Sequence, residues 1–155
     1  MKTQFMREAI RLSLQKMHGD HGGPFGAVVV RRGKIVGRGW NQVTSTNDPT
    51  AHAEVMAVRE ACRRLKTFQL DDCELYASCE PCPMCLAAGY WARLRKIYYA
   101  GTRRDAAAAG FDDDLIYREL TRPVSRRKLP MKQLLRRDAL KVFADWKQKP
   151  DKIRY

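Results

Sequence analysis

The sequence has no long hydrophobic run. None of its apolar stretches approaches the roughly eighteen residues that suggest a membrane-spanning helix. The hydrophobic region of a secretory signal peptide is also missing, and no internal repeat is evident. Of the five cysteines, two have the spacing of a metal site, which points to a reducing compartment. We therefore expect a cytoplasmic protein with no membrane association.

Acidic residues are scarce relative to basic ones. The 155 residues, a length that suits one domain, include 30 Lys and Arg but only 17 Asp and Glu, giving a formal charge of +13. Residues 118–155 hold 13 basic and 4 acidic residues, whereas the preceding 117 hold 17 and 13. The basic excess therefore lies mainly in the C-terminal segment. A solvated surface is the favoured interpretation, with contact to RNA as the alternative.

Histidine is rarer still, with three residues. His18 and His21 lie in a polar, glycine-rich loop and are not expected to bind metal. The third opens the motif His52-Ala-Glu54, which is followed thirty positions after His52 by the cysteines of Pro81-Cys-Pro-Met-Cys85. One imidazole and two thiolates supply three zinc ligands and leave a fourth position open for water, as hydrolytic zinc requires. We therefore predict a catalytic zinc site with His52, Cys82 and Cys85 as ligands.

The local sequence places both halves of this motif at helix starts. Asp48-Pro49 is typical of an N-cap followed by proline at the first helical position, and predicts a helix through about residue 65. His52 and Glu54 are two positions apart, so they point to different sides of a regular helix. They can converge only on a group that lies above the first turn of that helix. In this position Glu54 is suited to moving protons between a zinc-activated water and a substrate.

The cysteines are expected in the first turn of a second helix. Cys82 and Cys85 are three apart and share a face, and the helix dipole favours thiolates there. Cys79 and Cys82 have the same spacing and form an alternative ligand pair. The proline directly before Cys82 favours the later pair.

The remaining pattern alternates strands with helices, which predicts a layered α/β domain. Strands are expected at 25–31, 34–40, 73–78 and 96–100, and helices at 3–17, 49–65, 83–93 and around 135–146. No element is expected in the tail, residues 148–155.

These motifs resemble the cytidine and nucleotide deaminase superfamily, and within it the bacterial guanine-deaminating branch. The pattern H-x-E…P-C-x-x-C is that of zinc-dependent base deaminases. The motifs that carry the resemblance are Gly22-Gly-Pro-Phe-Gly-Ala27, Asn47-Asp-Pro-Thr-Ala-His-Ala-Glu54, Cys79-Glu-Pro-Cys-Pro-Met-Cys85, Tyr90-Trp-Ala-Arg93 and Ala109-Gly-Phe-Asp-Asp113. The first three partly match tRNA adenosine deaminases, whereas the last two and the terminal Tyr155 are similar to the guanine branch. The basic segment 122–137 departs from the family pattern.

The resemblance implies a three-layer α/β/α fold of the cytidine-deaminase type with a central mixed sheet, and a homodimer with zinc in each subunit. Residues 1–147 would form the deaminase domain, and residues 148–155 a tail that acts as an active-site lid exchanged between subunits. It also implies Glu54 and Asp113 as catalytic residues, and Phe25, Asn41, Trp91 and Tyr155 as substrate-binding residues.

Each pocket assignment has a structural alternative. Phe25 and Trp91 are equally typical of core packing, and Asn41 follows a strand and suits a turn. Asp113 stands between two further aspartates, any of which suits a helix cap.

The activity implied is zinc-dependent hydrolysis of guanine to xanthine and ammonia, in purine catabolism or salvage. A purine base is then the partner, and nucleic acid is possible but not favoured. The alternatives are deamination of adenosine in tRNA, deamination of guanosine or a related aminated heterocycle such as a triazine, and a non-catalytic RNA-binding module in which zinc only stabilises the fold.

Overall fold

The computed structural model describes residues 2–155 and divides the chain, between Asp113 and Asp114, into two units. The first unit holds the metal motif, and the second holds the basic C-terminal segment. This division lies earlier in the chain than the boundary expected after residue 147, so the last helix belongs to the second unit. No helix within residues 2–155 has the length and hydrophobicity needed to cross a membrane.

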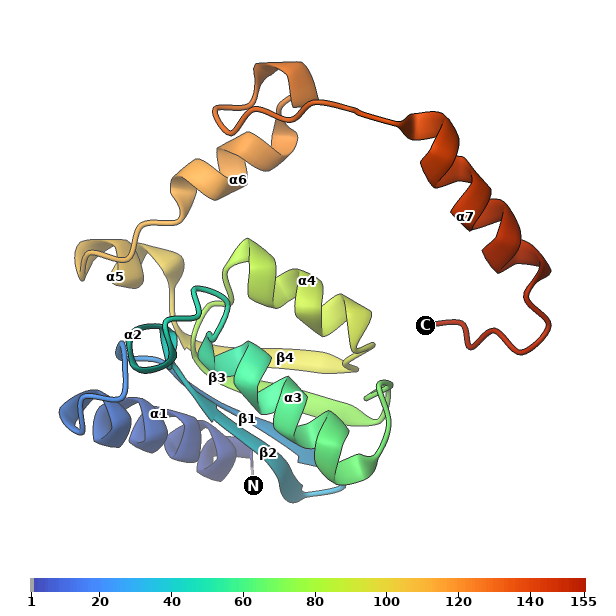
Figure 1. The fold of residues 1–155 in the computed structure, drawn as a ribbon. Helices are drawn as coiled ribbons and strands as arrows, with labels where there is room; N and C mark the ends of the chain where they lie inside the picture. Colours follow the sequence, from blue (N-terminus) through green and yellow to red (C-terminus); the bar gives the residue numbers. More distant parts are fainter. Residues whose placement is uncertain (1) are drawn as a thin grey trace. The chain divides into compact units, whose positions relative to one another are not determined.

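A four-stranded mixed sheet forms the centre of the first unit (Figure 1). Its strands are β1 (Gly26–Arg31), β2 (Lys34–Trp40), β3 (Cys73–Cys79) and β4 (Lys96–Gly101), in the order β2-β1-β3-β4. β1 pairs antiparallel with β2 and β3, whereas β3 and β4 are parallel. All four predicted strands are confirmed to within one residue at either end.

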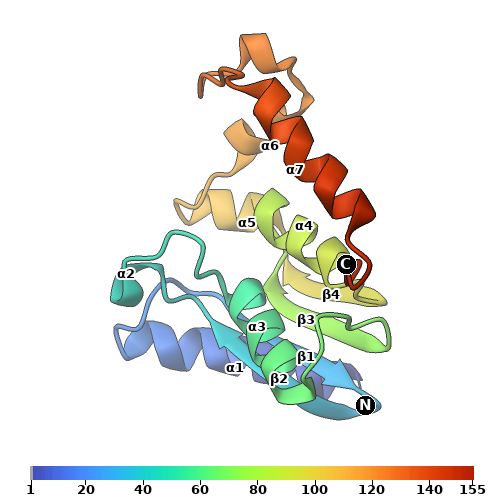
Figure 2. The ribbon, with the colours of Figure 1, turned by 45° about the vertical axis from the view of Figure 1, so that its right-hand side comes forward.

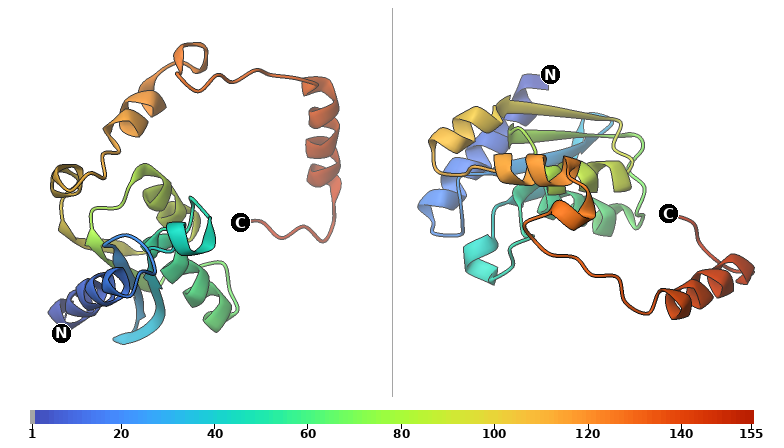
Figure 3. Two further views of the ribbon diagram at one scale, coloured as in Figure 1. Left: turned by 60° about the vertical axis from the view of Figure 1, so that its left-hand side comes forward. Right: turned by 90° about the horizontal axis from the view of Figure 1, so that it is seen from above.

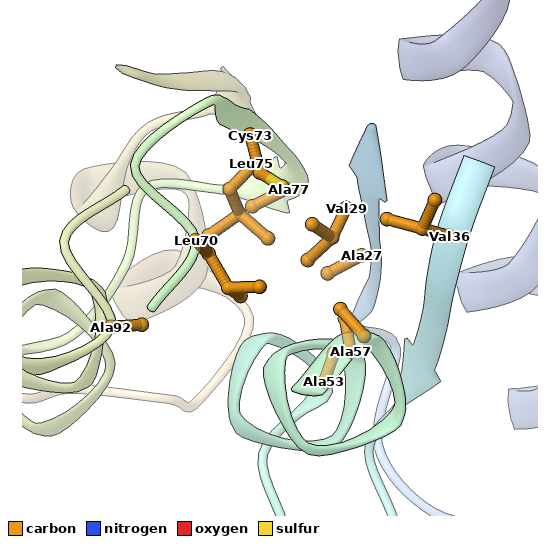
Figure 4. Close-up of a cluster of buried hydrophobic side chains, with 11 residues drawn as sticks. Ala27, Val29, Val36, Ala53, Ala57, Leu70, Cys73, Leu75, Ala77 and Ala92 are labelled. Atoms are coloured by element: carbon orange, nitrogen blue, oxygen red, sulfur yellow. The ribbon is translucent and has the colours of Figure 1, made fainter. Parts of the chain in front are cut away.

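Helices cover both faces of this sheet, which confirms the predicted three-layer fold. Helix α1 (Lys2–His18) lies on one face, and α3 (Ala53–Leu65) and α4 (Pro83–Trp91) lie on the other (Figures 1 and 2). Under α1, Phe5 packs against Tyr76 with ring centroids 5.4 Å apart. Under α3 and α4, small side chains and branched aliphatic ones form the larger core cluster (Figure 4).

The backbones of helix α3 and strand β2 are in direct contact, because two glycines of the strand face the helix. A Cβ on Gly39 would lie 2.0 Å from the carbonyl oxygen of Ala53, and one on Gly37 would lie 2.3 Å from that of Ala57. Ala53 and Ala57 are almost wholly buried against the sheet, as Figure 4 shows. The start of α3, which carries the metal motif, is therefore fixed by this close contact.

The predicted start of α3 was wrong by four residues. The side chain of Asp48 accepts hydrogen bonds from the backbone N–H and the hydroxyl of Thr50, at 2.8 and 2.6 Å, so it caps a local turn instead of a helix. The helix begins at Ala53, with His52 as its N-cap. A short helix, α2 (Val43–Thr46), occupies part of the segment expected to be irregular.

The first unit ends with α5 (Arg103–Ala108) and the loop 109–113. Thr102 and Asp105 form a capping box at the start of α5, in which each side chain accepts a hydrogen bond from the backbone of the other residue. This cap fixes the position at which the chain turns from β4 towards Asp113.

The second unit contains α6 (Asp114–Thr121), the 3-10 turn Val124–Arg126 and α7 (Arg136–Gln148). An extended connection separates the last two (Figure 3). The final helix and the irregular tail were predicted correctly. None of residues 114–155 is buried. Large apolar side chains, Leu134, Leu135, Val142 and Phe143 among them, are more than 60% exposed.

Candidate active site

The predicted metal ligands converge in the first unit. His52 is the N-cap of α3, Cys82 is the N-cap of α4, and Cys85 lies in the first turn of α4. The Nδ1 of His52 is 3.6 Å from the Sγ of Cys82 and 3.5 Å from the Sγ of Cys85. The Sγ of Cys79 lies instead 3.6 Å from the carbonyl oxygen of Thr102. The later cysteine pair is therefore the one that belongs to the site.

These separations fit a zinc ion. Zn–S bonds of about 2.3 Å and Zn–N bonds of about 2.0 Å at tetrahedral angles place neighbouring ligand atoms roughly 3.6 Å apart. The three ligand atoms of His52, Cys82 and Cys85 lie within 4.8 Å of one another, and within residues 2–155 no fourth ligand joins this group. Three protein ligands are the number typical of catalytic zinc, whereas structural sites have four.

The first turns of the two helices also favour negative charge at the site. The thiol of Cys85 donates to Cys82, and this hydrogen bond, together with the neighbouring His52, holds the pKa of Cys82 well below its usual range. Cys82 raises the pKa of His52 in return. Both effects favour the thiolate form of Cys82, in keeping with its position at a helix N-terminus.

Glu54 is buried beside the ligands. Only 8% of the residue is exposed, and its Oε2 lies 3.4 Å from the Sγ of Cys85. Burial raises the pKa of Glu54, and the negative charge of Cys82 raises it further. A carboxyl group whose pKa is moved towards neutrality is suited to taking up a proton and returning it.

A cavity of about 290 Å³ opens over this group. It brings together six of the predicted site residues, namely Phe25, Asn41, His52, Glu54, Cys82 and Asp113. Five further residues line it: Glu80, Arg103, Gly110, Phe111 and Asp112.

Asn41 and Phe25 form one wall of the cavity. The side-chain oxygen of Asn41 accepts hydrogen bonds from the backbone N–H groups of Gly23 and Val43, at 3.1 and 3.2 Å. This arrangement commits the oxygen to the protein and leaves the amide nitrogen as a donor for a ligand. The ring of Phe25 meets that of Phe111 edge to face, with centroids 4.9 Å apart.

The aspartate triplet contributes two residues to the lining of the cavity. Asp112 and Asp113 line the cavity, whereas Asp114 begins α6 and pairs with Arg118 at 2.8 Å. Burial raises the pKa of Asp113, and the charge of Cys82 adds to this effect.

The other two predicted substrate contacts are not brought together with these residues. Trp91 is the last residue of α4 and is 68% exposed. It is nine residues from Cys82, or about 13 Å along a helix, and does not line the cavity. Tyr155 belongs to the second unit, and its contact with substrate stays a prediction.

Sequence reasoning missed Glu80, Arg103 and Phe111. Glu80 lies within the motif Cys79–Cys85, so the sequence did contain a signal for it. Its carboxylate accepts a hydrogen bond from the backbone N–H of Arg103 at 3.0 Å. This bond ties the loop before α4 to the start of α5. Arg103 carried no recognisable signal in the sequence.

Comparison with known proteins agrees with this site. Residues 1–101 match the family model of the cytidine and deoxycytidylate deaminase zinc-binding region. A guanine deaminase of Bacillus subtilis is 49% identical over 151 residues, which cover 97% of each chain. A tRNA-specific adenosine deaminase of Aquifex aeolicus is 47% identical, but over only 77 residues, or 50% of this chain and 51% of the relative.

The fold of this chain is also similar to that of a protein of known structure. The X-ray structure of guanine deaminase from Bacillus subtilis superimposes with a TM-score of 0.96 at 48% identity, covering 99% of this chain and 98% of that one.

Proposed function

Because this chain belongs to the family defined by the cytidine and deoxycytidylate deaminase zinc-binding region, we propose that it catalyses the hydrolytic deamination of guanine to xanthine and ammonia. The observation that carries this function is the nearly full-length likeness to a guanine deaminase in a chain whose His52, Cys82 and Cys85 form a three-ligand metal site.

Zinc held by these three residues would supply a Lewis acid that lowers the pKa of water towards neutrality. The chain itself supplies the proton transfer. Glu54 is buried within 3.4 Å of a ligand sulfur, so its carboxylate is placed to accept the proton of the attacking water. It passes this proton to the ring nitrogen as the oxygen of water bonds to C2. It then takes the proton of the new hydroxyl group and passes it to the amine, and the bond between C2 and the amine breaks, so that ammonia departs.

The cavity residues account for recognition of guanine. The amide nitrogen of Asn41 is free to donate to a purine acceptor such as the guanine carbonyl oxygen, and the Phe25 ring offers an apolar surface to the base. Guanine presents N1–H and an exocyclic amine on one edge, whereas adenine has an acceptor at N1. We assign Asp113 to that edge, because its carboxylate accepts from guanine and repels adenine.

Homodimerisation with an exchanged tail is part of the proposal. Leu86, Tyr90 and Trp91 leave an exposed apolar surface on α4, and the second unit has no buried residue of its own. Burial against a second copy would stabilise both. Tyr155 would then close the partner's pocket and exclude water from the reaction. Trp91 does not line the cavity of the single chain, and we propose that it contributes to the subunit contact.

The decisive experiment is an ammonia-release screen of the zinc-loaded protein over free bases, nucleosides and triazines. Guanine should be the preferred substrate, with xanthine as the product, and chelation of zinc should abolish the activity. A folded, metal-loaded protein that is inert on guanine but fast on cytosine or adenine would overturn the assignment.

Deamination of adenosine in tRNA is the second candidate, favoured by the likeness of half of this chain to a tRNA-specific adenosine deaminase and by the basic C-terminal segment. It predicts tRNA affinity that falls steeply with salt, because phosphate neutralisation releases counterions. Salt-sensitive tRNA binding without turnover of any base would instead support a zinc-stabilised RNA-binding module.

A further inference from the structure

A second cavity lies beside the candidate active site and shares part of its wall. Its volume is about 590 Å³, compared with about 290 Å³ for the active-site cavity. The residues that line both are Asn41, His52 and Phe111. These three residues therefore form the partition between the two spaces.

Of these three residues, Phe111 is the one that has no other assigned role in the site. His52 is a metal ligand, and Asn41 is buried and bonded to two backbone groups. Phe111 is 44% exposed, and its backbone N–H donates to the carbonyl oxygen of Ala106 at 2.9 Å, whereas its ring is held by packing. Its ring meets Phe25 edge to face, and its Cε1 would lie 3.6 Å from a Cβ on Gly23.

The outer wall of the second cavity has a different chemistry from the active site. Exposed Asp20 and Thr44 supply a carboxylate and a hydroxyl, and Met17 and Val43 supply apolar surface. A carboxylate and a hydroxyl can hydrogen-bond vicinal hydroxyl groups, while apolar side chains pack against a carbon ring. This combination suits a sugar.

The position of this second cavity beside the metal site matters because of the covalent structure of guanine. The reacting carbon C2 is separated from the glycosidic nitrogen N9 only by N3 and C4, so the amine and a sugar on N9 lie along the same edge of the base, the edge that faces the DNA minor groove. A nucleoside therefore cannot present its amine to the metal site without placing its sugar beside that site.

We propose that Phe111 determines the choice between free base and nucleoside, and that the second cavity is the sugar subsite from which its ring closes off the active site. This inference rests on the proposed deamination of guanine. With Phe111 in place the chain deaminates the base and rejects guanosine. Truncation of the ring joins the two cavities and admits the sugar.

The test is the ratio of kcat/KM for guanosine to kcat/KM for guanine. In Phe111→Ala this ratio should rise at least tenfold over wild type, with a smaller rise in Phe111→Leu, which keeps an apolar contact if the alanine variant folds poorly. Phe68→Ala is the matched control, because Phe68 is 45% exposed and lines neither cavity. Adding Asp20→Asn to Phe111→Ala should remove part of the gain without changing the rate on guanine.

The inference is overturned if wild type already uses guanosine as well as guanine, or if both Phe111 variants lower the two activities equally at full zinc content. Should wild type release no ammonia from guanine, the proposed function itself fails. Calorimetric titration with guanosine then tests the role of Phe111 without relying on turnover. Phe111→Ala must bind guanosine at least tenfold more tightly than wild type, and unchanged affinity rejects the inference.

Discussion

The Sγ of Cys85 lies 3.4 Å from Oε2 of Glu54, so a metal ligand and the residue assigned to proton transfer are in direct contact. The contact follows from their positions, because each occupies the first turn of a separate helix and both turns face the same point. Because Glu54 is not itself one of the three ligands, it can be substituted while all three metal ligands are kept.

Glu54→Gln should lower turnover of guanine by about 10²- to 10⁴-fold, the contribution typical of general acid–base catalysis. Zinc content, measured by atomic emission, should stay at the wild-type level. Glu60→Gln makes the same chemical change on the same helix, outside the cavity, and should keep the activity. Loss of zinc together with activity in Glu54→Gln would mean that the carboxylate serves the metal site and not the proton transfer.

Asp113→Asn should reduce turnover of guanine far more than it reduces zinc content or thermal stability, because an amide oxygen accepts less strongly than a carboxylate and carries no charge. Asp114→Asn is the matched control, since Asp114 starts α6 and does not line the cavity. If Asp112→Asn abolishes activity while Asp113→Asn is silent, the role belongs to the neighbouring carboxylate.

Deletion of residues 148–155 should leave folding and zinc content intact and lower turnover at least about tenfold, equivalent to about 1.4 kcal/mol in transition-state stabilisation. Mixing the truncated protein with full-length Glu54→Gln should restore activity, because a heterodimer places an intact tail over an intact site. Full activity of the truncated protein alone would contradict the lid, and failure of complementation would show that each tail serves its own subunit.

Gly39→Ala should destabilise the protein by about 3 kcal/mol in urea unfolding, because its Cβ would meet the Ala53 carbonyl at 2.0 Å and overpacking against backbone cannot be relieved by a rotamer change. Zinc affinity should fall too, since His52 adjoins Ala53. Gly101→Ala, whose Cβ would meet its nearest neighbour at 3.5 Å, should be tolerated. Equal effects of the two substitutions would argue against the close packing of α3 on β2.

Stability should fall as the pH rises above 9. Burial raises the pKa of Cys73 from 9.0 to about 11, so between these values the unfolded chain loses a proton that the folded chain keeps. The unfolded state then binds fewer protons, and the free energy of unfolding decreases with pH. Thermal melts should show that the stability advantage of wild type over Cys73→Ala shrinks from pH 9 to 11 but is constant from pH 6 to 8. A constant difference across both ranges would refute the assignment.

Local pattern was sufficient to predict the four strands and the helices α1, α4 and α7, but not the short helices α2, α5 and α6. Alternation and β-branched residues marked the strands, and the spacing of Cys82 and Cys85 marked the first turn of α4. The start of α3 was misjudged because Asp48 satisfies a nearby turn, a competition that residue preferences alone do not decide. The partition at Phe111 was not foreseeable, since it depends on contacts with Phe25 and Gly23, more than eighty positions earlier in the chain.

The order of the site residues along the chain has a consequence for how such proteins diversify. All three ligands and Glu54 precede the end of β4, whereas Phe111, Asp112, Asp113 and the tail follow it. Metal binding and proton transfer thus lie in one stretch of the chain, whereas the pocket is built from both stretches, with Phe25 and Asn41 before β4 and Phe111 and Asp113 after it. Exchange of the segment after Gly101 would therefore alter the contacts that Phe111 and Asp113 make with the base, while the metal ligands, Glu54, Phe25 and Asn41 stay in place.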